Sequence, residues 1–130
     1  MAKQGQRGKR PAKGRVAEQL ANPPRTDWRA ALRDFGARVR EAYGQRLSRL
    51  VLYGSRARGD AESDSDVDVV VVLKAYDDFW AEVNVLSTLS GEILLDHGIV
   101  LSAMPASVKE LEESEKSIFQ NVRREGVTIQ

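Results

Sequence analysis

The sequence predicts a single α/β (α+β) domain in which a small β-sheet is flanked by helices. Two apolar runs with strand character, residues 50–53 and 66–73, are separated by a polar loop. Apolar residues at helical spacing precede and follow this pair, at residues 28–43 and 79–96. Such alternation of helices and short strands is typical of mixed α and β folds. A length of 130 residues fits one domain with its own core and leaves little room for a separate substrate domain.

The composition is that of an ordinary soluble protein, with a net charge of +1 and 42% hydrophobic residues. The chain has no cysteine, which excludes a disulfide framework, a thiol nucleophile and a cysteine-based zinc site. No apolar run approaches the length of a membrane span, and the N-terminus lacks the apolar segment of a signal peptide. We therefore expect a cytoplasmic protein without membrane contact.

Residues 1–25 are predicted to form a disordered basic tail, and residues 26–130 the folded domain, because the tail has no apolar periodicity. Clustered cations bind nucleic acid by releasing counterions from its phosphates, so a weak nucleic-acid contact is one interpretation. No aromatic residue lies between the charges, which favours a solvated extension or a start codon assigned too far upstream. The cations concerned are Lys3, Arg7, Lys9, Arg10, Lys13 and Arg15.

The first element of the domain is predicted to be a helix from Thr26 or Asp27 to about Tyr43. Either residue can cap a helix, and Gly44 is a suitable stop. A strand is expected next, at residues 47–53. The apolar residues of the helix recur at intervals of three and four and are expected to pack on the sheet; they are Trp28, Leu32, Phe35, Val39 and Tyr43.

A second long helix is predicted after the valine run, capped by Asp77 or Asp78 and continuing to about Asp96. His97 and Gly98 end it. A histidine beside a helix-ending glycine is more often a partner of the helix dipole than a catalytic base. The expected apolar side of this helix consists of Phe79, Val83, Leu86, Ile93 and Leu94.

The last third of the chain is predicted to alternate again between strand and helix. Pro105 is expected to stop a strand, and Ser107 with Glu110 forms a capping box that begins a helix. The predicted elements are a strand at 99–104, helices at 107–113 and 115–125, and a short edge strand at 127–129.

The loop between the two central strands carries the candidate functional residues. Alternate side chains of a strand share a face, so Asp66 and Asp68 are expected side by side, opposite the neighbouring valines. Adjacent carboxylates repel each other unless a cation lies between them, and Mg²⁺ commonly takes one or two carboxylates together with substrate phosphates. At the start of the loop, Gly54 permits close approach of a phosphate, and a short helix opening at Ser55 would direct N–H groups toward an anion. The pattern predicts that metal and phosphate share one site.

Two arginines of this loop have alternative roles. Arg58 would either neutralise a triphosphate or pair with a nearby acidic residue, Asp60, Glu62 or Asp64. For Arg56 the structural role is favoured.

A calcium site is the competing interpretation, because Asp64, Asp66 and Asp68 match the first ligands of an EF-hand loop. It fails because Val69 stands where that loop needs glycine, and Ala75 replaces its bidentate glutamate. The simplest structural alternative is that the aspartates lie at the solvent-exposed start of a strand and have no functional role.

In chain order the loop region contains Gly54-Ser55, Arg58-Gly59 and Ser65-Asp66-Val67-Asp68. Together these motifs resemble the signature of the nucleotidyltransferase superfamily with the DNA polymerase β type fold, specifically its minimal one-domain (MNT) members. The resemblance covers roughly residues 32–130. It implies a small mixed β-sheet flanked by helices, a nucleoside triphosphate held by Gly54 and Ser55, and Mg²⁺ held by Asp66 and Asp68, which are then the catalytic residues. Arg58 and Ser65 are further candidates for nucleotide binding.

Family members that catalyse transfer usually carry a third carboxylate, on the strand predicted here at 99–104, which completes the ligands of the metal that activates the attacking hydroxyl. This strand has none, and Ser102 lies about where that residue is expected. A neutral hydroxyl neither anchors Mg²⁺ strongly nor takes a proton from the acceptor. Asp96 and Glu92 are candidates to replace it from a shifted position. The absence of this third carboxylate affects catalysis more than nucleotide binding.

The predicted function is Mg²⁺-dependent transfer of AMP from ATP to a hydroxyl of a protein partner, with release of pyrophosphate. By resemblance to minimal family members, the partner is expected to be a HEPN-type ribonuclease toxin and this chain its antitoxin. The alternative from a different class is a catalytically inactive module that binds and regulates a partner, which Ser102 motivates. A third hypothesis, adenylylation of a small molecule such as an aminoglycoside, lacks the usual acceptor-binding domain.

Overall fold

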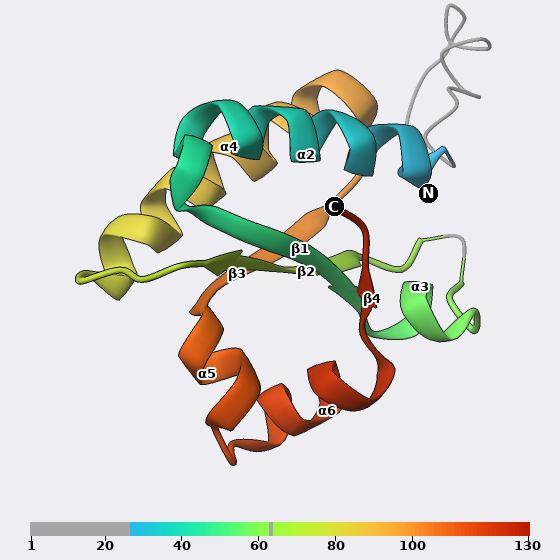
Figure 1. The fold of residues 1–130 in the computed structure, drawn as a ribbon. Helices are drawn as coiled ribbons and strands as arrows, with labels where there is room; N and C mark the ends of the chain where they lie inside the picture. Colours follow the sequence, from blue (N-terminus) through green and yellow to red (C-terminus); the bar gives the residue numbers. More distant parts are fainter. Residues whose placement is uncertain (1–26, 63) are drawn as a thin grey trace, which may run out of the picture.

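The computed structural model describes residues 27–62 and 64–130, which form a four-stranded sheet between two layers of helices (Figure 1). The strand order is β3-β2-β1-β4, with β2 parallel to β3 and β1 antiparallel to both β2 and β4. The sheet is therefore mixed, as the family resemblance implies. The predicted basic tail lies outside the described residues. The strands are β1 (Leu47–Tyr53), β2 (Val67–Leu73), β3 (Leu101–Ser107) and β4 (Val127–Thr128).

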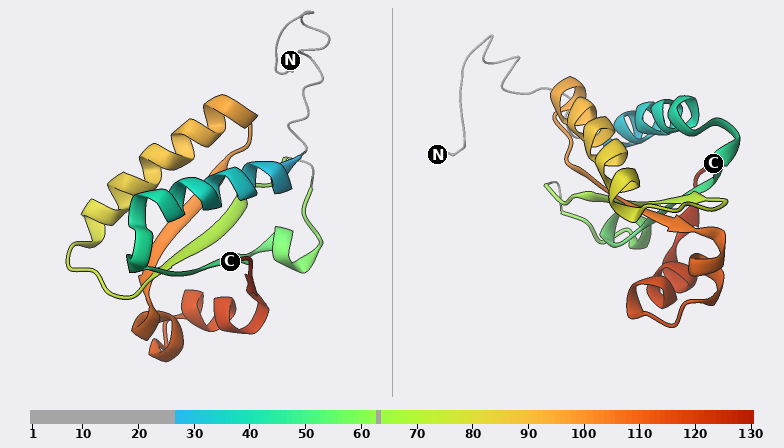
Figure 2. Two further views of the ribbon diagram at one scale, coloured as in Figure 1. Left: turned by 45° about the horizontal axis from the view of Figure 1, so that its top comes forward. Right: turned by 90° about the vertical axis from the view of Figure 1, so that its left-hand side faces the viewer.

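Two long helices cover one face of the sheet, called here the upper face, and two short helices cover the lower face (Figures 1 and 2). A short helix, α3 (Ser55–Arg58), follows β1 directly and lies beyond the end of the sheet. The upper helices are α2 (Trp28–Tyr43), which continues into a 3-10 turn (Gly44–Arg46), and α4 (Phe79–His97). The lower helices are α5 (Val108–Glu113) and α6 (Ser117–Glu125).

No helix among the described residues combines the length and the apolar character that crossing a membrane requires. The cytoplasmic location stays a prediction.

Alternation along the strands divides the core in two. In β2, Val67, Val69 and Val71 belong to the upper core, whereas Val70 and Val72 belong to the lower one. This is why β2 is apolar at nearly every position: both of its faces are covered by helices. The predicted stripe of α2 is confirmed, because its members from residue 32 onward are buried in the upper core; these are Leu32, Phe35, Val39 and Tyr43.

Helix starts follow the predicted caps. The Asp27 carboxylate accepts a hydrogen bond of 3.1 Å from the Ala30 N–H, and the Asp78 carboxylate caps α4 in the same way. Both bonds of the predicted capping box are present at α5, since Ser107 and Glu110 each accept from the other's backbone N–H at 3.0 Å. These side chains satisfy N–H groups that have no partner within the helix.

Three expectations about the elements are wrong. Pro105 lies inside β3 instead of ending it, which is possible because β3 is an edge strand, where proline is tolerated. Asp66 lies just before β2 and not within it. Phe79 and Leu94 of α4 are exposed, although their spacing predicts a buried position.

A charged residue occupies part of the face of α4 that was expected to be apolar. Glu82 is only 8% exposed. Its carboxylate accepts a hydrogen bond of 2.8 Å from the Tyr43 hydroxyl and one of 2.6 Å from the Arg46 guanidinium. Burial of Tyr43, together with the Glu82 carboxylate, raises the pKa of this phenol well above its ordinary value. The contact therefore joins the end of α2 to the start of α4.

Glu82→Ala is expected to lower the free energy of unfolding by about 1–3 kcal/mol, because it leaves the buried Tyr43 hydroxyl without an acceptor. Urea denaturation measures the change. The matched control is Glu113→Ala on the exposed side of α5, which is expected to stay within about 0.5 kcal/mol of the unsubstituted protein. A loss at Glu82 no larger than that of the control would show that the contact is not stabilising.

Candidate functional site

The candidate site lies at the edge of the sheet where β1 ends and β2 begins. Tyr53, the last residue of β1, is the cross-strand partner of Asp68. Since Val70 and Val72 point into the lower core, alternation places Asp68 on the lower face as well. Tyr53 packs against the same lower core. The first β-strand and the aspartate-bearing strand are thus adjacent, as predicted.

Gly54 is the residue that brings the loop backbone against the Asp68 carboxylate. A Cβ atom added at Gly54 would lie 2.6 Å from Asp68 Oδ2, so only glycine lets the carboxylate come this close to the backbone. Its backbone angles, φ 77° and ψ −157°, belong to a region that is essentially restricted to glycine. Ser55 follows at once as the first residue of α3. The structure therefore brings together Gly54, Ser55 and Asp68, while their roles toward a ligand stay predictions.

The arginines of α3 point to different surroundings. The Arg58 guanidinium pairs with Asp60 at 3.2 Å, as its structural interpretation predicts, and also with Glu125 at 3.2 Å. The positive charge of Arg58 also acts to lower the pKa of Asp68, against the effects that raise it. The Arg56 guanidinium donates a hydrogen bond of 3.0 Å to the backbone carbonyl of Ser65, which agrees with the structural role favoured for it.

Ser65 and Asp66 belong to the segment that leads into β2. The Ser65 hydroxyl accepts a hydrogen bond of 2.9 Å from the Glu62 N–H, and the Ser65 N–H donates to the Glu62 carbonyl at 3.1 Å. This turn is tied to α3 by Arg56. Asp66 is exposed, whereas Asp68 is half-buried. The two carboxylates therefore differ in how much water reaches them.

The electrostatics of the site penalise the charged form of Asp68. Burial is the main cause of its raised pKa, the negative charge of Asp66 adds to it, and the positive charge of Arg58 opposes it. Burial and then the charge of Asp68 also raise the pKa of Tyr53. A carboxylate whose charge is destabilised in this way would be stabilised by a bound cation.

Asp66→Asn is expected to lower the pKa of Asp68 toward its ordinary value, because it removes the like charge and leaves the burial unchanged. Carboxyl ¹³C chemical shifts followed against pH measure this change. Asp60→Asn serves as the control, since Asp60 acts on Arg58 and is not among the groups that raise the pKa of Asp68. If both variants left the pKa of Asp68 unchanged, the two aspartates would not share a site.

No third carboxylate joins the pair within the described residues, where no group of three or more acidic or histidine side chains could hold a metal. Ser102 is the direct cross-strand neighbour of Asp68 on β3, as its sequence position suggests. A metal at this site would therefore have two carboxylates as its charged protein ligands. That set fits Mg²⁺, which usually completes its shell with water and substrate phosphates.

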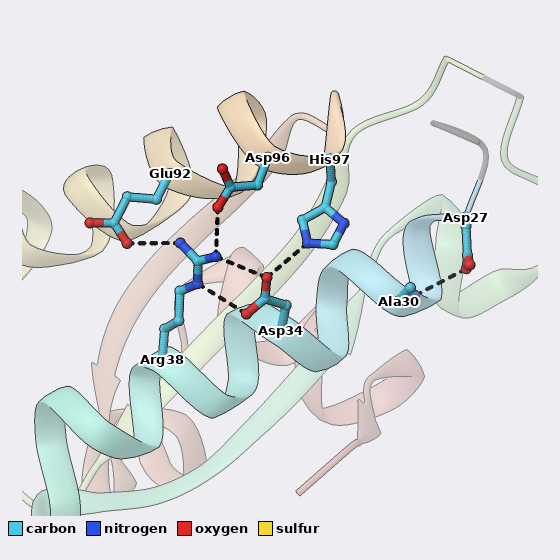
Figure 3. A network of polar contacts seen from close by, with 7 residues as sticks. All are labelled: Asp27, Ala30, Asp34, Arg38, Glu92, Asp96 and His97. Atoms are coloured by element: carbon cyan, nitrogen blue, oxygen red, sulfur yellow. Dashed lines mark hydrogen bonds and ion pairs between the residues drawn. The ribbon is translucent and has the colours of Figure 1, made fainter. Parts of the chain in front are cut away.

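The two substitutes considered for the third carboxylate have another partner. Figure 3 shows Glu92 and Asp96 on α4 pointing to Arg38 of α2. Their carboxylates lie 2.9 Å and 2.7 Å from its guanidinium. Arg38 also pairs with Asp34, whose pKa is lowered first by Arg38 and then by His97. These four charges connect the two upper helices, so Glu92 and Asp96 act in the packing of the fold.

His97 belongs to the same network. Its Nε2 atom lies 2.8 Å from the Asp34 carboxylate, and Gly98 ends α4 in a left-handed conformation. The single histidine is therefore a structural residue at a helix end, and Figure 3 shows it directed at α2. This agrees with the interpretation favoured from its position beside a glycine.

Glu125 is one of two residues near the site that sequence reasoning missed. It stands 67 positions after Arg58, and its nearest sequence neighbours are those of an ordinary exposed helix end. The contact arises only because α6 returns under the sheet. Tyr53 was likewise not predicted, since a tyrosine that ends an apolar run is indistinguishable from a core residue.

Comparison with known proteins identifies relatives of this arrangement. A family model described as "Polymerase beta, Nucleotidyltransferase" matches residues 41–130. A relative named "Putative protein adenylyltransferase MJ0604", from Methanocaldococcus jannaschii, is 29% identical over 97 residues, which cover 74% of this chain and 91% of the relative.

Solved structures show the same fold at low sequence identity. One is titled "Crystal structure of a putative nucleotidyltransferase from Sulfolobus solfataricus"; it is 18% identical with a TM-score of 0.57, over 90% of this chain and 88% of the other. Another, titled "Crystal structure of the toxin-antitoxin with AMP-PNP", is 16% identical with a TM-score of 0.54, over 75% and 71% of the two chains.

Proposed function

Because the chain belongs to the polymerase beta nucleotidyltransferase family, we propose that it transfers AMP from ATP to a hydroxyl group of a protein partner. The observation that carries the proposal is the contact of Gly54 with Asp68, which joins the two halves of the predicted motif in one place. The relative named as a protein adenylyltransferase supports both the adenylyl group and the protein acceptor. The similarity to a structure titled as a toxin-antitoxin with AMP-PNP supports the same nucleotide and a toxin as the partner.

Each of the loop residues makes a different contact with the nucleotide. The backbone N–H groups of Gly54 and Ser55 and the Ser55 hydroxyl donate hydrogen bonds to a phosphate. Arg58 supplies a positive charge beside them, and Ser65 lies at the other end of the loop. The Asp60 and Glu125 carboxylates keep Arg58 in this position until a triphosphate competes for its guanidinium.

Asp66 and Asp68 would hold Mg²⁺, which when bound neutralises the charge of the triphosphate. The acceptor oxygen forms a bond to the α-phosphorus, the bond from this phosphorus to the oxygen that bridges the α and β phosphates breaks, and pyrophosphate leaves. The proton of the acceptor is released. Catalysis then consists of positioning and charge neutralisation by these residues.

The second candidate function is binding without transfer. It is favoured by one observation, the neutral Ser102 beside Asp68 where catalytic relatives are expected to carry an acid. In that case the chain would bind and regulate its partner by contact alone. The partner proposed for both functions is a toxin of the HEPN type, as the family resemblance implies.

Incubation of the protein with α-labelled ATP, Mg²⁺ and the co-purified partner separates the two functions. Transfer of label to the partner, lost in Asp66→Asn/Asp68→Asn, is the expected result. A stable complex with no label on the partner would favour the binding module. Full transfer by the double variant would overturn the proposed mechanism.

A further inference from the structure

A cavity of about 620 Å³ lies on the side of the sheet opposite Asp68. Its volume is within the range of about 300–1,000 Å³ that is usual for small-molecule sites. Leu32 and Leu52, which help to line it, belong to the upper core, whereas Asp68 faces the lower one. We call this cavity the reverse pocket. It is lined by Trp28, Arg29, Leu32, Arg33, Leu52, Arg56, Ala57, Val127, Ile129 and Gln130.

The lining of the reverse pocket has one sign of charge. Three arginines and no acidic residue are among the described residues that line it. The chain as a whole is nearly balanced, with 20 basic and 19 acidic residues, so this local excess is not a property of the general surface. Arg29 and Arg33 are exposed beside the apolar part of this lining, and their two positive charges together attract an anion.

The indole ring of Trp28 packs against two of these arginine side chains. The guanidinium carbon of Arg29 lies 4.5 Å from the centre of the Trp28 ring, and that of Arg56 lies 5.3 Å from it. The contact with Trp28 holds the flat guanidinium group of Arg29 against the aromatic ring while its N–H donors stay available for an acidic group. Beside them, the side chains of Leu32, Leu52 and Ile129 form an apolar surface. The charged and the apolar parts of the lining therefore lie side by side.

The net charge of residues 1–26 has the same sign as that of the pocket lining. Residues 1–26 are strongly basic, and Glu18 is their only acidic residue. Arginines that line a cavity repel a basic peptide. The chemistry of the lining thus favours a ligand that carries negative charge and an apolar body.

We propose that the reverse pocket is a second binding site, specific for an organic anion in which a carboxylate, sulfonate or phosphate is joined to an apolar ring or chain. The acidic group contacts Arg29 and Arg33, and the apolar part lies against Leu32, Leu52 and Ile129. This site is distinct from the nucleotide site, and its existence does not depend on nucleotidyl transfer.

Arg56 connects the reverse pocket to the candidate active site. It lines the cavity, and it also donates a hydrogen bond to the Ser65 carbonyl, one residue before Asp66. We therefore leave Arg56 unchanged in the test, so that a loss of binding cannot be caused by a shift of the aspartate loop.

The test uses two fluorescent probes that differ in charge and share their rings. Anilinonaphthalene sulfonate is an anion with an apolar body, and phenylnaphthylamine is its neutral counterpart. The full chain is expected to bind the sulfonate at one saturable site. Arg29→Gln/Arg33→Gln is expected to weaken the sulfonate about tenfold, and to change the affinity for the neutral probe by less than about twofold.

The control Arg40→Gln/Lys109→Gln removes the same charge from exposed positions outside the pocket and is expected to leave both affinities unchanged. Val127→Trp, which enlarges a side chain in the lining, is expected to weaken both probes. Thermal unfolding followed by circular dichroism verifies that each variant is folded. The proposal is overturned if the arginine variant binds the sulfonate like the unsubstituted protein. It is also overturned if binding is instead lost in Leu95→Gln, a change on the exposed apolar surface of α4 where Leu95 is 86% and Trp80 71% exposed.

Discussion

Asp68→Asn is expected to lower the rate of nucleotidyl transfer by about 10³-fold or more and, at neutral pH, to raise the free energy of unfolding. The loss of rate follows because the amide keeps the shape of the side chain but removes half of the charge that the site offers to Mg²⁺. The gain in stability follows from burial, which raises the pKa of this carboxyl and so destabilises its charged form in the folded protein.

The sign of the pH dependence is set by the raised pKa. Between the ordinary value of 3.8 and the raised value, the folded state binds more protons at Asp68 than the unfolded state does. The contribution of this residue to the free energy of unfolding therefore falls as the pH rises through that interval. Asp68→Asn removes this contribution. The variant should therefore have a higher free energy of unfolding than the unsubstituted protein at pH values above this interval, and the difference should vanish at pH values below it.

Asp64→Asn is the matched control for Asp68→Asn, since Asp64 lies in the same loop but is exposed. Its transfer rate and its stability are both expected to stay close to those of the unsubstituted protein. Denaturation at several pH values and single-turnover transfer measure the two quantities. If Asp68→Asn lost stability at neutral pH, the carboxylate would have a structural role that its environment does not suggest.

The parts of the fold that could be predicted are those in which a short stretch determines its own conformation. The start of α2 depends on Asp27, and the capping box of α5 depends on two residues three positions apart. The valines of β2 define their own alternation between the two faces. From these the adjacency of Gly54 and Asp68 also follows, because an antiparallel strand pair joined by one loop places the end of one strand beside the start of the next.

The parts that could not be predicted depend on contacts between distant segments. Glu82 is buried because the end of α2 brings Tyr43 to it and the following 3-10 turn brings Arg46, and nothing in the surrounding α4 sequence indicates these contacts. Glu125 reaches Arg58 only through the path of the last helix. Pro105 can lie within a strand because β3 is at an edge, and the strand order is a property of the whole sheet.

Gly54→Ala is expected to lower the affinity for Mg²⁺-ATP by about 10²-fold and the free energy of unfolding by about 1–3 kcal/mol. The loss of stability has its cause in the backbone, whose angles at this residue are almost never adopted by alanine. The loss of affinity has a second cause. The added Cβ would lie 2.6 Å from Asp68 Oδ2, so either the carboxylate or the loop must move, and the two halves of the site separate.

Gly44→Ala separates the effect of the backbone conformation from the effect of the Cβ atom beside Asp68. Gly44 also has a positive φ, 57°, with an extended ψ of −128°, but a Cβ there would meet no atom within 4 Å. Both alanine variants should therefore lose stability, and only Gly54→Ala should lose nucleotide affinity, as measured by calorimetric titration with a non-hydrolysable ATP analogue and Mg²⁺. Equal affinity in the two variants would mean that the nucleotide binds away from the junction of Gly54 and Asp68. In that case the close approach of backbone to carboxylate would serve only to turn the chain from β1 into α3.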